Sequence, residues 1–156
     1  MKIRLITIGK TDESYLKEGI NKYLSRLKHY VGFEVLEILD VKTGKKLNTL
    51  AQKESEGKEI LKIISKSDFV VLLDEKGREF SSVGFSQFLQ KRMNTGMDLT
   101  FVIGGPFGFS KDIYLRADSK IGLSQMTFSH QMIRLFFIEQ LYRSFTILKG
   151  EKYHHL

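Results

Sequence analysis

Apolar and polar positions along the chain follow strand-like and helix-like spacings in turn. Residues 2–9 place β-branched residues among alternating polar positions and end in glycine, which is typical of a strand. Residues 33–39 predict a second strand. The continuous apolar runs at 69–73 and 99–103 predict strands that are covered on both faces, as in parallel sheets. A brief fifth strand is expected at residues 121–123.

Between the predicted strands, apolar residues recur three and four positions apart, as on one face of a helix. The first helix is expected to begin at a cap formed by Thr11 or Asp12 and to bury a stripe that includes Leu16 and Leu27. A second helix is expected to follow a polar loop from residue 43, with Leu50 on its apolar side, and to end near Ser65. A third is capped by Ser81 or Ser82 and stops at residues 94–96. A fourth, short and capped, runs from Ser110 to about Ala117.

The last and longest helix is expected over residues 130–149, with Phe136 and Phe137 among its inward positions. It carries two arginines, Arg134 and Arg143, nine residues apart. At 3.6 residues per turn, this spacing points them to different sides of the helix, so they need not serve one ligand. Arg143 fits either a solvated rim position or a functional one.

Strands that alternate with helices predict an α/β fold with a mostly parallel sheet flanked by helices. A turn at residues 75–79, which is expected to use Gly77, follows the third strand. Ligands of such sheets gather at the carboxyl ends of the strands, so the loops after Leu73, Ile103 and Leu123 are the first places to look. The chain shows no repeat and no shift of composition, so we expect a single domain over residues 1–156.

Composition excludes several classes of protein. The 156 residues contain no cysteine, which rules out a disulfide scaffold, thiolate catalysis and iron–sulfur clusters. A chain of this length can bury enough surface to fold without a metal. Lys2 and Arg4 interrupt the opening apolar stretch, and no run approaches the ~18 apolar residues of a membrane span. A soluble cytoplasmic protein with no membrane segment is therefore expected.

The net charge is positive, since 25 Lys and Arg stand against 18 Asp and Glu, a formal +7. This surplus favours polyanionic partners such as nucleic acid, although a basic pI is also common among proteins that bind nothing charged. The candidate phosphate contacts are Lys2, Arg4, Lys22, Arg26 and the pair Lys45 and Lys46.

Two stretches, residues 99–110 and 121–133, carry no formally charged side chain, although 28% of the chain is charged. Uncharged loops with permissive glycines indicate a buried wall where main-chain groups meet a neutral ligand such as a nucleobase. The alternative is that both stretches are core or subunit interface. The glycines at 104–108 fit neither a dinucleotide fingerprint, because Ile103 stands where its first glycine would be, nor a phosphate-binding P-loop.

Three histidines, His130, His154 and His155, lie within the last 27 residues. Their spacing matches no standard metal-binding pattern, and we expect no metal. The terminal residues from Glu151 combine Tyr153 with two imidazoles and a lysine. These residue types can stack on a base and move a proton near neutral pH.

Four motifs, in this order, resemble the RlmH family of ribosomal large-subunit pseudouridine N3-methyltransferases, which belongs to the SPOUT superfamily. They are VIGGPFG at 102–108, LSQMTFSHQMIR at 123–134, IEQLYR at 138–143 and YH at 153–154. The opening ten residues and the total length also fit, so the resemblance covers nearly the whole chain. Two positions depart from the family pattern: Ser129 stands where proline is common, and Phe107 occupies a variable site that is often polar.

The resemblance implies a homodimer whose C-terminal part forms a deep trefoil knot. It also implies methylation at N3 of a pseudouridine in 23S ribosomal RNA on the assembled ribosome, with S-adenosylmethionine as the cofactor. Three loops of the family hold this cofactor. The matching residues are Leu73, Gly104, Leu123, Ser124, Gln125, Met126, Thr127 and Phe128.

The proton on N3 must be lost before the ring can attack a methyl group, so a base or a stabiliser of the deprotonated ring is needed. The matching residues suggest His154 as the proton acceptor, Arg143 as the stabiliser of negative charge and Tyr153 as a stacking partner. In a dimer, this tail can complete the pocket of the partner. Two other functions remain open: a non-catalytic, ribosome-associated RNA-binding module and a small-molecule methyltransferase.

Overall fold

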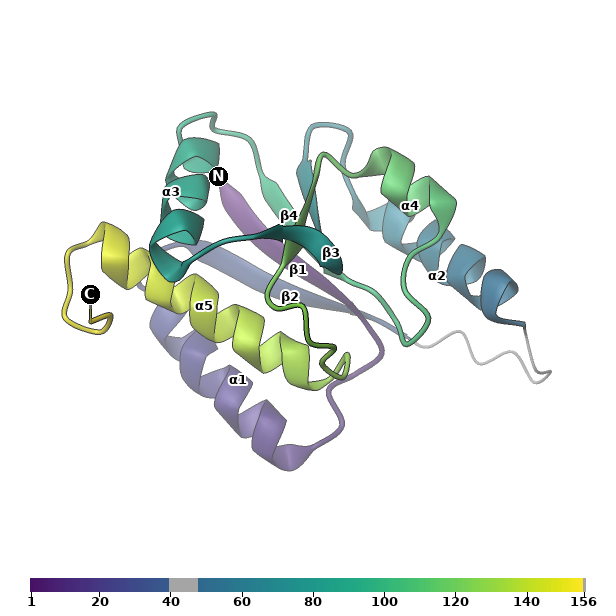
Figure 1. Ribbon diagram of the computed structural model, residues 1–156, viewed down its shortest axis with the longest axis horizontal. Helices are drawn as coiled ribbons and strands as arrows, with labels where there is room; N and C mark the ends of the chain where they lie inside the picture. The colour runs from purple at the N-terminus through teal and green to yellow at the C-terminus, as the bar shows by residue number, and fades with distance from the viewer. Residues whose placement is uncertain (40–47, 156) are drawn as a thin grey trace.

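Five parallel strands form the central sheet of the protein, in the order β2-β1-β4-β3-β5 (Figure 1). The computed structural model describes residues 1–39 and 48–155, so Lys45, Lys46 and the start of the predicted polar loop lie outside the described residues. The prediction of a parallel sheet is confirmed. The strands are β1 Lys2–Ile8, β2 Gly32–Ile38, β3 Phe69–Glu79, β4 Leu99–Ile103 and β5 Ser119–Gly122.

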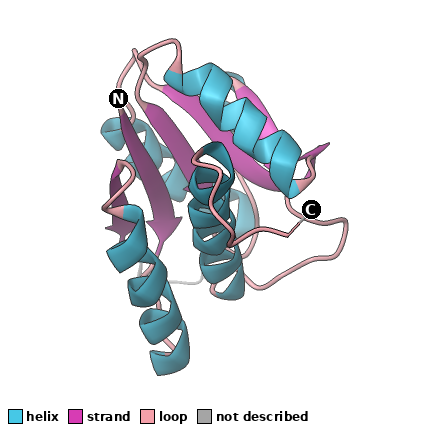
Figure 2. Ribbon diagram, turned by 90° about the vertical axis from the view of Figure 1, so that its left-hand side faces the viewer, coloured by secondary structure: helices cyan, strands magenta, loops and turns pink. Residues whose placement is uncertain are grey.

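Helices cover both faces of this sheet (Figure 2). The helices are α1 Ser14–Leu27, α2 Thr49–Ile63, α3 Ser82–Met93, α4 Lys111–Arg116 and α5 Met132–Leu148. α5 packs between α1 and α3 on one face, and α2 and α4 pack together on the other. The α/β architecture with flanking helices is therefore confirmed, whereas the trefoil knot stays a prediction.

The alternation of side chains along β1 explains the two cores. Ile3 and Leu5 belong to the larger cluster, under α1, α3 and α5, whereas Ile6 and Ile8 belong to the cluster under α2 and α4. Successive side chains of a strand point to opposite faces, so one strand supplies both. β4 is buried at all five positions, as its continuous apolar sequence predicts.

Two of the three predicted helix caps are present. The Oγ atoms of Ser81 and Ser110 accept hydrogen bonds from the first turns of α3 and α4. The predicted cap at Thr11 or Asp12 is wrong, because α1 begins at Ser14 without a side-chain cap. The N–H of Thr11 instead donates to Glu37, and that of Asp12 to the side chain of Gln131, so this segment links β1 to β2 and α5.

The predicted turn at residues 75–79 is also wrong, because β3 continues to Glu79. Its pairing with β5 shifts register after Leu73, and Arg78 and Glu79 then pair with Ile121 and Gly122. At Gly77 the strands β3 and β5 come so close that a Cβ on this residue would lie 2.6 Å from backbone atoms of Ile121. Glycine is needed here for close backbone approach and not for a turn.

Two apolar positions that the sequence predicts to be buried are exposed. Leu50 near the start of α2 is 60% exposed and Phe136 of α5 is 43% exposed. Phe137 and Ile138 on α5 are fully buried, and neighbouring helix positions diverge by about 100°, so Phe136 is turned away from the sheet. Its ring packs instead against Phe128, with 5.1 Å between ring centroids.

Candidate functional site

A cavity of about 440 Å³ lies at the carboxyl ends of β4 and β5 and beside the middle of β3. The second half of β3, from Leu73, and the loops after Ile103 and Leu123 meet there. The three positions that the sequence predicts therefore lie together, although no loop follows Leu73. His130 and Ile133, at the start of α5, and Tyr114 of α4 complete the wall. Of the residues that the resemblance assigns to the cofactor, Leu73, Gly104, Leu123, Ser124, Met126, Thr127 and Phe128 line the cavity, whereas Gln125 does not.

The wall of the cavity combines apolar residues with a short charged segment, Asp74, Glu75 and Lys76. Ile103, Ile121 and Leu123 supply aliphatic surface, and the uncharged loop 104–108 folds into a tight turn in which Gly108 N donates to Gly105 O. Asp74 and Glu75 supply carboxylates. This arrangement suits a ligand with a neutral planar part and a positively charged part.

Both carboxylates also connect neighbouring segments to the middle of β3. The hydroxyl of Tyr114 donates to Asp74 Oδ2 at 2.7 Å, and that of Thr127 donates to Glu75 Oε2 at 2.6 Å. Burial and the hydrogen bond to Asp74 raise the pKa of Tyr114 to about 12, so this phenol stays a donor at neutral pH. Sequence reasoning missed Asp74 and Glu75, although carboxylates directly after the buried apolar run at 69–73 were a usable signal.

The buried carboxylate of Glu56 packs against Gly105 in the loop 104–108. Glu56 of α2 is 4% exposed and accepts a hydrogen bond from Gln52. A Cβ on Gly105 would lie 2.6 and 2.8 Å from its two carboxylate oxygens. A side chain at Gly105 would displace the Glu56 carboxylate, a contact that no pattern in the sequence indicates.

Arg134 holds the start of α5 against the carboxyl end of β1. Its side chain is 1% exposed and donates to the carbonyls of Ile8, Gly9 and His130 and to the hydroxyl of Thr11, at 2.7–3.2 Å. The residue was predicted to point away from Arg143, and its contacts confirm this. Because His130 and Ile133 line the cavity, Arg134 fixes one of its walls.

The tail docks onto the last turns of α5 and forms a second cluster, which we call the tail cluster: Glu139, Arg143, Tyr153 and His154. Glu139 Oε1 accepts from Arg143 Nε at 3.1 Å, from Arg143 Nη2 at 2.7 Å and from the Tyr153 hydroxyl at 2.9 Å. Arg143 Nη1 lies 3.2 Å from His154 Nδ1. The three residues that the resemblance suggests for catalysis are thus brought together, and Glu139, which sequence reasoning missed, joins them.

The tail cluster holds its charges in fixed states. Hydrogen bonds to Glu139 raise the pKa of Arg143 above its ordinary value. Burial, with hydrogen bonds to Tyr23 and Glu139, raises the pKa of Tyr153 well above 10. Arg143 also lies over the Tyr153 ring, 4.7 Å from its centroid. Arg143 is therefore a packed cation and not a solvated rim residue, and Tyr153 is a neutral phenol near pH 7.

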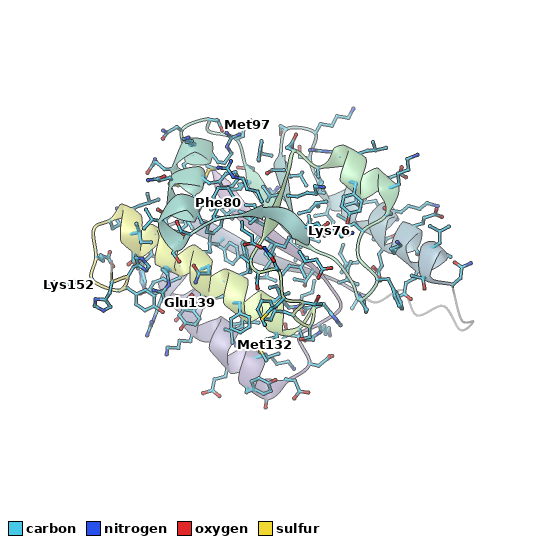
Figure 3. All side chains as sticks on the ribbon, in the orientation of Figure 1. Lys76, Phe80, Met97, Met132, Glu139 and Lys152 are labelled. Carbon is cyan, nitrogen blue, oxygen red and sulfur yellow. The ribbon has the colours of Figure 1, made fainter. Side chains whose placement is uncertain are left out.

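The cavity and the tail cluster lie at different ends of α5. Ile133 in the cavity wall and Arg143 are ten residues apart, about 15 Å along a helix. In Figure 3, Glu139 lies on α5 and Lys152 on the loop beyond its end. Within residues 1–39 and 48–155, the cavity wall contains no member of the tail cluster.

The predicted phosphate contacts fall into two groups. Lys2 and Arg4 form ion pairs at the amino ends of the strands, with Glu34 for both and with Asp68 and Asp98 for Arg4. These acidic partners neutralise them, so we no longer expect them to bind phosphate.

Lys22 and Arg26 lie instead on α1, beside the tail cluster. Arg26 stacks over the rings of Tyr23 and Tyr142, and Tyr142 contacts the Tyr153 ring. In the part of the chain that the structure describes, neither Lys22 nor Arg26 forms an ion pair with a carboxylate.

Among residues 1–39 and 48–155, no His, Asp and Glu side chains form a group of three or more that could hold a metal ion. None of the helices in these ranges combines the length and the apolar character that crossing a membrane requires.

Comparison with known proteins places the chain among methyltransferases. The family described as predicted SPOUT methyltransferases matches residues 1–154. Proteins named ribosomal RNA large subunit methyltransferase H are similar over 99% of both chains, with 60% identity in Christiangramia forsetii, 58% in Flavobacterium psychrophilum and 57% in Parabacteroides distasonis.

A crystal structure of a probable rRNA-methyltransferase from Porphyromonas gingivalis aligns with 94% of this chain and 69% of that one, at 13% identity and a TM-score of 0.46. This likeness is too distant to carry an argument. The family match over nearly the whole chain, together with the identity to the three relatives, shows that this chain belongs to the SPOUT methyltransferase family.

Proposed function

We propose that the protein transfers a methyl group from S-adenosylmethionine to N3 of a pseudouridine in 23S ribosomal RNA, on the assembled ribosome in the cytoplasm. The observation that carries this proposal is the cavity beside the middle of β3 and the carboxyl ends of β4 and β5, with its uncharged loops and its two carboxylates. The names of the relatives support ribosomal RNA as the substrate. The net charge of +7 favours the same polyanion.

The chemistry of the cavity fits this cofactor. An adenine is planar and neutral, and Leu73, Gly104 and the residues 123–128 that line the wall offer apolar surface and main-chain groups for it. A sulfonium is positive, and Asp74 and Glu75 are the carboxylates that favour this charge. When bound, S-adenosylmethionine supplies an electrophilic methyl group.

The tail cluster is proposed to bind the target base and to stabilise its deprotonated form. The N3–H bond of the uracil ring breaks and its electron pair forms the new N–CH₃ bond, while the proton goes to solvent. Negative charge develops on the ring carbonyls before the methyl group arrives, and the fixed cation of Arg143 stabilises it. Tyr153, held by Glu139, offers a ring on which the base can stack.

The protein is further proposed to act as a homodimer in which the tail cluster of one protomer meets the cavity of its partner. The separation of about 15 Å along α5 supports this arrangement. The exposed rings of Phe136 and Phe128, in contact beside the cavity, offer an apolar surface for the partner.

Phe136→Asp is expected to convert the dimer into monomers and to reduce methylation at least tenfold, because a buried unpaired charge opposes association. Analytical ultracentrifugation and a methylation assay would measure both effects. Leu115→Asp, at an exposed apolar position on α4, is the matched control and is expected to change neither. A Phe136→Asp variant that stays dimeric would contradict the placement of the interface.

Lys22→Ala combined with Arg26→Ala is expected to raise KM for ribosomes about tenfold and to leave the affinity for S-adenosylmethionine unchanged. The reason is that two unpaired cations beside the tail cluster are positioned for phosphates that flank the target base. The dependence of KM on salt should weaken, since fewer counterions are released. Lys66→Ala, an exposed lysine before β3, is the control, and an unchanged KM in the double variant would refute these contacts.

The reaction is tested by incubating the protein with S-adenosylmethionine that carries a labelled methyl group and with intact ribosomes, free subunits or naked RNA. Mass spectrometry of the digested RNA is expected to find the label on N3 of one pseudouridine. Thermal stabilisation by the donor separates this function from a non-catalytic RNA-binding module. Turnover without RNA would instead indicate a small-molecule methyltransferase.

A further inference from the structure

The contact between Arg143 and His154 determines where the imidazole carries its proton. Arg143 Nη1 lies 3.2 Å from His154 Nδ1. A guanidinium can only donate hydrogen bonds, so Nδ1 must accept and must be unprotonated. A neutral imidazole has one proton, and in His154 this proton is therefore on Nε2.

The other hydrogen bonds of Arg143 hold it in this orientation. Its Nε and Nη2 both donate to Glu139 Oε1, which leaves Nη1 for His154. Tyr153 donates to the same carboxylate oxygen and fixes the tail beside the helix. A planar guanidinium that is held on two of its nitrogens cannot turn its third away without breaking these bonds.

We propose that His154 serves the methyl transfer as a hydrogen-bond donor through Nε2–H, and not as the proton acceptor that the sequence suggests. This inference rests on the proposed function. The donor would face a carbonyl oxygen of the uracil ring, where negative charge develops once N3 loses its proton. The N3 proton passes to solvent, the N3 electron pair takes the methyl group, and the sulfonium leaves as a neutral thioether.

The lone pair that a proton acceptor needs is already occupied. A proton added to Nδ1 would face the N–H of Arg143, so two positive groups would meet at 3.2 Å. The other titratable or charged groups in and around the tail cluster are Glu139 and Tyr142 on α5, Tyr153 on the tail, and Tyr23 and Arg26 on α1. Glu139 already binds Arg143 and Tyr153, so it does not offset this repulsion at His154.

The donor role is tested by comparing His154→Gln with His154→Ala. A glutamine amide can donate near the position of Nε2 but is not a base near pH 7. We expect His154→Gln to retain kcat within about tenfold and His154→Ala to lose roughly 10²–10³-fold, the usual effect of removing a donor to a developing oxyanion. His155→Gln, at the neighbouring exposed position, is the control. Equal losses in His154→Gln and His154→Ala would overturn the proposal.

The pH profile gives a second readout. With solvent as the proton acceptor, kcat/KM should rise through the neutral range in the wild type and in His154→Gln alike. If the imidazole were the base, kcat/KM of the wild type would instead reach a plateau at the pH where the ring is neutral, and this plateau would be absent in His154→Gln. Such a plateau would contradict the donor role.

Nitrogen NMR of the imidazole gives a third readout that needs no turnover. The wild-type protein should show His154 with a protonated Nε2 and an unprotonated Nδ1, and Arg143→Ala should allow a second population with the proton on Nδ1. A proton on Nδ1 in the wild type would refute the assignment. Because the tautomer is read on the protein alone, failure of this inference is distinguishable from failure of the methylation assay.

Discussion

Gly77→Ala is expected to destabilise the protein by about 3 kcal/mol and to abolish binding of S-adenosylmethionine. The added Cβ would lie 2.6 Å from the backbone N and C atoms of Ile121 and 2.8 Å from Gly122 N. Backbone atoms cannot move aside like the end of a flexible side chain, so β3 and β5 must separate. Lys76 and Ile121, which line the cavity, would move with them.

Chemical denaturation and calorimetry measure the two effects of Gly77→Ala. At this chain length, 3 kcal/mol corresponds to a fall in Tm of roughly 10 °C. Gly32→Ala is the matched control, because a Cβ at Gly32 of β2 would meet nothing within 4 Å. Wild-type stability and binding in Gly77→Ala would show that the two strands do not depend on this close approach.

Arg134→Met is expected to cost about 3–5 kcal/mol of stability, because it removes the donor from several buried acceptors at once. Ile8, Gly9 and His130 each lose a hydrogen bond to a carbonyl. Methionine fills much of the same volume, so the loss comes from unsatisfied polar groups more than from a cavity. The affinity for S-adenosylmethionine should also fall, since the start of α5 is a wall of the cavity.

Thermal unfolding of Arg134→Met and Arg134→Lys separates the contributions. A lysine ammonium can reach some of these acceptors but cannot span them as a fork, so an intermediate Tm is expected. Lys91→Met, at an exposed position of α3, should unfold like the wild type. An Arg134→Met protein with the wild-type Tm would mean that water satisfies these carbonyls.

Much of the fold could be predicted from the sequence because its signals are local. Strands such as β4 are continuous apolar runs, and the caps Ser81 and Ser110 are determined by residues three positions away. The errors occur where distant segments decide the structure. Gly77 has the sequence context of a turn residue, but the structure places it against the backbone of Ile121. Thr11 and Asp12 donate their N–H groups to Glu37 and Gln131 instead of capping α1.

The residues of the site also divide into those that local sequence signals predict and those that depend on distant segments. The rule that ligands gather where parallel strands end was enough to bring Leu73, Gly104 and Leu123 to one cavity, and uncharged loops marked the last two. Glu139 and Glu56 could not be assigned, because their partners, the tail residue Tyr153 and the loop residue Gly105, are 14 and 49 positions away. A carboxylate acquires such a role only through the packing of elements that the sequence does not place.

The proposed function requires the methyl donor to bind in the cavity beside the middle of β3 and the carboxyl ends of β4 and β5, and calorimetric titration with S-adenosylmethionine tests this most directly. We predict saturable binding to the wild type, with a negative change in heat capacity between two temperatures because apolar wall is buried. Gly32→Ala should bind equally and Gly77→Ala should not. No binding to the wild type at either temperature, or equal binding to Gly77→Ala, would contradict the account.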